Sequence, residues 1–87
     1  MTKQYYSVGI DAQEAMLGSM DFYRLMMDTE AHCTDHGSDD DPTIYVLYDS
    51  IEHRDAAYQA FRDRFRTARQ IYSPHTLEVD ADTDQDK

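Results

Sequence analysis

A short run of metal-ligand residue types stands near the middle of the chain, where the sequence reads A-H-C-T-D-H. It brings His32, Cys33 and His36 within five residues of one another, next to Asp35. A zinc site requires three or four converging nitrogen, sulfur or oxygen ligands. No second Cys/His pair lies elsewhere, because Cys33 is the one cysteine of the chain. We therefore interpret the run as a frayed helix end without a metal, and keep a metal-binding or redox-sensing site as an alternative.

Motifs for catalysis are equally weak in this sequence. Cys33 lacks a separate His-plus-acid framework, and the three glycines are too far apart to form a phosphate-binding loop. The alternating aspartates of residues 80–86 resemble the start of a calcium loop, but Gln85 stands where such a loop needs glycine. We therefore expect no enzymatic activity and no cofactor.

Negative charge is concentrated in one part of the chain. The formal net charge is −10, and residues 25–53 hold eight acidic residues without a single Lys or Arg. An acidic field repels nucleic acid and attracts basic protein surfaces. We therefore expect the acidic segment to bind a basic, nucleic-acid-binding protein rather than nucleic acid itself. Its members are Asp28, Glu30, Asp35, Asp39, Asp40, Asp41, Asp49 and Glu52.

Positive charge follows in residues 54–69, which contain five arginines. Arg62, Arg66 and Arg69 have helical spacing (i, i+4, i+7), so they line one face of the helix expected here. The favoured interpretation is a solvated face whose local ion pairs contribute only a few tenths of a kcal/mol each. The alternative is a basic stripe that docks the acidic loop or an acidic partner.

Hydrophobic periodicity indicates an α+β domain of α/β-like order, β-α-β-α-β. We expect a small three-stranded sheet with two main helices packed on one face, in a single domain over residues 1–79. Residues 34–42 should form an acidic loop and residues 80–87 a disordered acidic tail. The expected elements are a strand at Tyr6–Ile10, a helix from its cap at Asp11 to about Ala31, a strand at Thr43–Tyr48, a helix from Asp49 to about Gln70 and a strand at Leu77–Val79. Glu14 has the capping-box position of the first helix, and Gly18-Ser19 is a potential break within it, with Ser19 as the cap of the second piece. Ser73-Pro74 should end the second helix, whose Tyr58, Phe61 and Phe65 should be buried.

The first of these helices is apolar on more than one side, which predicts packing on two sides. One stripe contains Met16, Met20, Tyr23, Met27 and Ala31, while Phe22, Leu25 and Met26 lie away from it. The central strand also has a second apolar side, formed by Tyr45 and Leu47. We expect Phe22, Leu25, Met26, Tyr45 and Leu47 to form a surplus apolar surface that binds a partner or a second copy.

Size, acidity and compactness together resemble one functional class: small inhibitors, made by phages and mobile elements, that mimic nucleic acid and block CRISPR effectors or other defence proteins. The leading hypothesis is therefore a protein-binding inhibitor of this kind. Halophilic adaptation of a small regulatory or dimeric domain is the alternative explanation of the Asp-rich composition. The sequence lacks a stretch of 18 apolar residues and a signal peptide at its start, which predicts a cytoplasmic protein.

Overall fold

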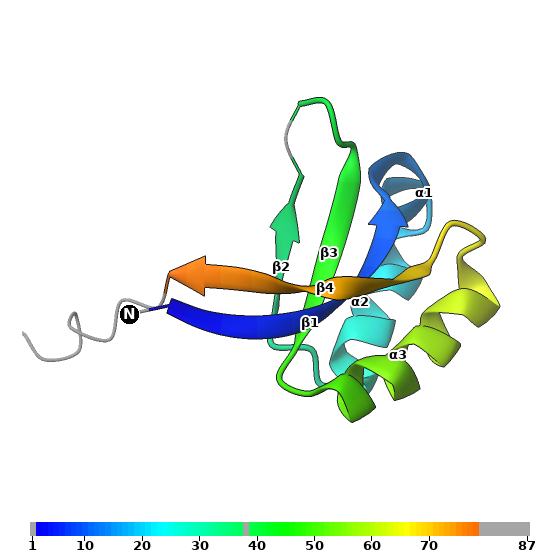
Figure 1. Cartoon of the computed structure of the whole chain (residues 1–87). Coiled ribbons are helices and arrows are strands. Elements are labelled where there is room, and N and C mark those ends of the chain that lie inside the picture. The colour runs from blue at the N-terminus through cyan, green and yellow to red at the C-terminus, as the bar shows by residue number, and fades with distance from the viewer. Residues whose placement is uncertain (1, 38, 79–87) are drawn as a thin grey trace, which may run out of the picture.

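The computed structural model describes residues 2–37 and 39–78, in which three helices cover one face of an antiparallel sheet (Figure 1). The sheet has four strands in the order β2-β3-β1-β4. The α+β class is thus confirmed, whereas the prediction of three strands is wrong. The elements are β1 (Thr2–Asp11), α1 (Ala12–Leu17), α2 (Ser19–Asp28), β2 (Cys33–His36), β3 (Thr43–Tyr48), α3 (Ile51–Arg64) and β4 (Arg69–Glu78).

The strand that the sequence did not predict is β2. Its residues, Cys-Thr-Asp-His, carry the polar composition of a loop, and only their pairing with β3 makes them a strand. Cys33 pairs with Leu47 and His36 with Ile44 in an antiparallel hairpin. The loop predicted for residues 34–42 is therefore shorter and begins after His36, and Ser38 within it lies outside the described residues.

At its C-terminal end, α3 is shorter than predicted, because the chain leaves the helix after Arg64 and enters β4 at Arg69. Phe65 adopts extended backbone angles (φ −117°, ψ 123°) and is fully buried, so the helix ends where this ring enters the core. Pro74 does not end a helix but lies inside β4, an edge strand, where proline is tolerated. Val79 and the predicted tail, residues 80–87, lie outside the described residues.

The caps of the helices match the sequence prediction only in part. Asp11 caps α1 as expected, since its Oδ1 accepts the N–H of Gln13 at 2.8 Å. Ser50 rather than Asp49 caps α3, with its Oγ accepting the N–H of His53 at 3.1 Å. The first predicted helix is interrupted at Gly18-Ser19, where a break was expected, but Gly18 rather than Ser19 has the cap position of α2, without a side-chain hydrogen bond.

Side chains from all three helices and from β1 and β3 form the core. Phe22 of α2 packs against Phe61 and Phe65, with ring centroids 5.8 and 6.1 Å apart. Phe61 and Phe65 are fully buried as predicted, whereas Tyr58 is only partly buried. The sheet contributes Val8, Ile10, Ile44, Val46 and Tyr48 to this core.

The sheet face opposite the helices is partly covered by β4, the last strand of the sheet. β4 crosses this face (Figure 1), so that His75 of β4 contacts Asp35 of β2 at 2.7 Å although the two strands are not neighbours. Tyr45 is partly buried beside the His75 ring, and Leu47 is 0% exposed. The prediction that Tyr45 and Leu47 form an uncovered surface is therefore wrong.

A buried arginine, Arg54, links α3 to the paired strands β1 and β4. Arg54 of α3 reaches the β1–β4 pair, where its guanidinium donates to the carbonyl of Ile71 at 2.6 Å and to that of Ser7 at 3.4 Å. The register of the two strands shifts next to this point, between Tyr5 and Ser7. Arg54 thus satisfies backbone carbonyls where the ladder is irregular, because buried polar groups need partners.

Candidate functional site

Five large apolar side chains on α1 and α2 face solvent. They are Met16 and Leu17 of α1 and Met20, Tyr23 and Met27 of α2, and they are between 63% and 84% exposed. We name the surface formed by Met20, Tyr23 and Met27, which line one depression, the methionine face. Met20, Tyr23 and Met27 follow one another at helical spacing along one side of α2. In monomeric proteins, a contiguous exposed apolar stripe of this kind usually marks an interaction site.

Phe22, Leu25 and Met26, the residues predicted to be the surplus surface, lie on the other side of α2. Phe22 is 6% exposed, and Leu25 and Met26 are partly buried against the core. The two sides are therefore exchanged relative to the prediction. Phe22 packs inward against Phe61 of α3 and Phe65, the residue that follows this helix, and the methionine side of α2 therefore faces outward.

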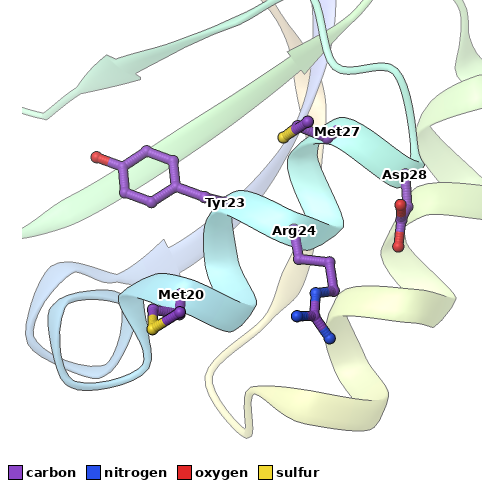
Figure 2. Close-up of a pocket in the computed structure, with 5 residues that line it drawn as sticks. All are labelled: Met20, Tyr23, Arg24, Met27 and Asp28. Atoms are coloured by element: carbon purple, nitrogen blue, oxygen red, sulfur yellow. The ribbon is translucent and has the colours of Figure 1, made fainter.

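Part of the methionine face is hollowed into a shallow depression of about 350 Å³ between Met20, Tyr23 and Met27. Two charged residues of α2, Arg24 and Asp28, complete its lining. Figure 2 shows Arg24 and Asp28 on the side of α2 toward α3, with Tyr23 pointing the other way. The depression is thus apolar along its axis and charged on one side.

The polar side of α1 is occupied by a contact within the chain. Glu14 accepts the backbone N–H groups of Arg66 and Thr67, at 2.8 and 2.9 Å, and the hydroxyl of Thr67. Burial raises the pKa of Glu14, but the hydrogen bonds from Thr67 and Arg66 outweigh it and hold the pKa below its usual value. This carboxylate fixes the turn between α3 and β4, and in the structure it does not serve the cap of α1, for which the sequence predicted it.

The predicted acidic segment is divided between the two ends of β3 (Figure 1). Asp39, Asp40 and Asp41 lie in the β2–β3 loop before the strand begins. The other end of β3 leads to Asp49 and Glu52. A six-residue strand is about 20 Å long, so the two groups do not form one continuous array.

Asp28 and Glu30 belong to the second of these groups, because α2 ends beside the end of β3. The hydroxyl groups of Thr29 and Tyr48 are 2.7 Å apart, and His53 Nε2 lies 2.5 Å from the Thr29 carbonyl oxygen. Burial raises the pKa of Tyr48 to about 12, against the opposing effect of the Thr29 hydrogen bond. Asp28 and Glu30 are exposed at this junction.

Two carboxylates of the acidic segment, Asp35 and Asp41, accept hydrogen bonds within the fold. The hydrogen bond from His75 is the main reason why the pKa of Asp35 lies below its usual value. Hydrogen bonds from Tyr45 and then Thr43 lower the pKa of Asp41 in the same way. These two residues therefore have structural roles, whereas Asp39 and Asp40 are exposed.

The metal-ligand residue types do not converge. Cys33 and His36 lie three positions apart on β2, so they point to opposite faces of the sheet. His32 stacks on Tyr5 at 4.8 Å. Over residues 2–37 and 39–78, no group of three His, Cys, Asp or Glu side chains is arranged to hold a metal ion.

The predicted basic stripe does not form, because α3 ends before its last two members. Arg62 is exposed on α3, Arg66 lies in the following turn, and Arg69 begins β4. Arg69 approaches the Thr43 hydroxyl at 3.4 Å. The three arginines thus belong to three different environments.

The sequence held a signal for the methionine face, but it was assigned to the core. Met20, Tyr23 and Met27 all belong to the apolar stripe of the first predicted helix. Phe and Leu are buried more often than Tyr, and this preference favours Phe22 and Leu25 over Tyr23 as the inward residues.

Comparison with known proteins gives no match: no family model, no curated protein and no solved structure aligns significantly with the chain. Among the described helices, none has the length and apolar character needed to cross a membrane.

Proposed function

We propose that this protein is a cytoplasmic protein-binding domain that acts by association rather than by catalysis, with the methionine face as its docking surface. The observation that carries the proposal is the exposure of Met20, Tyr23 and Met27 along one side of α2. Methionine is flexible and polarisable, which suits it to protein-binding surfaces, and tyrosine is enriched at interfaces. The residues on the other side of the same helix already complete the core, so the exposed side is available to a partner.

Site-specific photo-crosslinking in the cell tests this proposal. A photoreactive amino acid at position 20 should give protein adducts, because this side chain lies within the docking surface. The matched control is position 59, since Gln59 is also exposed and helical but lies on α3. Adducts of equal yield from both positions, or from neither, would contradict the proposal.

A second candidate function is the nucleic-acid mimic suggested by the acidic composition. The observation that favours it is the exposed pair Asp39 and Asp40 in the β2–β3 loop, within a stretch that lacks Lys and Arg. A basic, nucleic-acid-binding protein is the partner that such charges would attract.

Changing both residues to Asn tests the mimic without disturbing the loop. Asp41 is left unchanged, because its hydrogen bonds to Tyr45 and Thr43 hold the start of β3. Binding to a basic partner should weaken through slower association, as expected for charges that steer an encounter. Unchanged association would remove this candidate and leave the methionine face.

A further inference from the structure

We propose that the methionine face binds the same face of a second copy of this chain, with the two α2 helices antiparallel across a two-fold axis. This inference rests on the proposed function and names its partner. Closed two-fold dimers are the commonest soluble oligomers, and their interfaces present the same patch from both copies. The argument depends on the area of the face, on its charge and on the position of two residues.

The area fits an interface between two small proteins. The three side chains of the methionine face, together with Met16 and Leu17 on the preceding helix, present on the order of 600 Å², against about 800 Å² per partner in a standard interface. The neighbouring rim of α1 and α2 supplies the remainder. The depression between Met20, Tyr23 and Met27 gives side chains of the opposing face a place to insert.

The charge around the face also fits a second copy better than a basic partner. Glu14 is engaged with the turn after α3, and Asp21 pairs with Arg64 at 2.6 Å. The charges left beside the depression are Arg24 and Asp28, which balance each other. On a chain of net charge −10, this neutral region is where two copies approach with the least repulsion.

Arg24 and Asp28 make the face complementary to itself. They lie one helical turn apart on the same side of the methionine stripe (Figure 2). When two such helices pack face to face and antiparallel, the charged side of one copy meets the charged side of the other in reversed order. Arg24 then approaches Asp28 of the second copy, and this contact occurs twice. In a parallel arrangement, the charged side would instead meet the side that carries Tyr23.

Charge reversal and charge exchange test this geometry through the dissociation constant of the dimer, measured by sedimentation velocity. Arg24→Asp and Asp28→Arg should each weaken the dimer by about tenfold, because each change places like charges at two symmetric contacts. The double variant Arg24→Asp/Asp28→Arg should return to within about threefold of the parent. The control matched to Arg24→Asp is Arg62→Asp, which makes the same change of net charge at an exposed position on α3 and should have a smaller effect.

Salt provides an independent arm of the same experiment. The parent dimer should strengthen as salt rises, since screening reduces the repulsion between two copies of charge −10. Association with a basic partner would weaken instead. Met20→Glu should abolish the dimer while the thermal unfolding of the monomer is retained.

Three results would overturn the inference. The first is a monomer at every concentration and salt level. The second is a double variant whose dimer is as weak as that of either single variant. The third is a set of in-cell adducts from position 20 that contain only other proteins. The last result would leave the proposed function intact, because the methionine face would still be a docking surface. Absence of any adduct would remove both.

Discussion

The two sides of α2 are built from similar residues but have opposite environments. Phe22, with Leu25 and Met26 near it, packs toward α3 and the sheet, whereas Met20 and Met27 face solvent. The difference lies in the packing partners. The Phe22 ring packs against the buried rings of Phe61 in α3 and Phe65 just after it, whereas no described element covers the other side of α2. Apolar composition alone therefore does not identify the core side of a helix. The exposed side is surplus to folding, which is why we assign it to binding.

The largest expected effect separates the two sides by stability. Phe22→Ala should lower the free energy of unfolding by about 3 kcal/mol, because it removes a ring from the aromatic cluster. Tyr23→Ala, one position along, should change it by less than about 0.5 kcal/mol because the ring is exposed. Urea denaturation of both variants measures the contrast. Equal losses would mean that both sides contribute to the core.

A smaller effect is expected at the break that separates α1 from α2. A Cβ atom at Gly18 would lie 3.1 Å from the ring of Phe65, which is fully buried and has little room to move. We expect Gly18→Ala to cost about 1 kcal/mol, although alanine is otherwise favoured in a helix. The control is Ser19→Ala at the adjacent exposed position. A gain in stability at Gly18 would show that α1 and α2 can move relative to α3.

The smallest effect concerns the polar side of α1 and depends on pH. The folded pKa of Glu14 is lowered, so its stabilisation is complete above the unfolded pKa, about 4.3, and is lost as the pH falls through the folded value. Asp35 and Asp41 act in the same direction. Glu14→Gln should therefore lose less stability than the parent between neutral and acid pH. Denaturation curves at both pH values measure this difference. An identical loss of unfolding free energy in the parent and the variant would contradict the stabilising role of the Glu14 hydrogen bonds to Arg66 and Thr67.

The sequence was sufficient for the elements whose signal is local. Alternating apolar residues located β1 and β3, and the Asp11 cap located the start of α1. The strand β2 was missed, and β4 was predicted only near its end, at Leu77–Val79, because their pairing with distant residues rather than their own composition makes these segments strands. The partial burial of Tyr45 was missed for the same reason, since it requires His75 of β4 to lie beside its ring.

The candidate site was predictable only in its composition. The stripe of methionines was visible, but its orientation depends on packing against Phe61 and Phe65, which lie far away in the sequence. The acidic segment was equally clear as a run of residues, and β3 then separates its members to two ends of the molecule. Patterns along the chain thus identified side chains with a potential role but not which of them share a surface.

Methionine methyl NMR tests the central claim most directly, because the chain carries its own control. Met20 and Met27 lie on the methionine face, while Met26 lies between them in sequence and is partly buried against the core. In a concentration series of the purified protein labelled at the methionine methyl groups, we expect the signals of Met20 and Met27 to shift while that of Met26 stays constant. Constant signals for all three residues at every concentration, and again on addition of cell extract, would contradict the assignment of this face to protein binding.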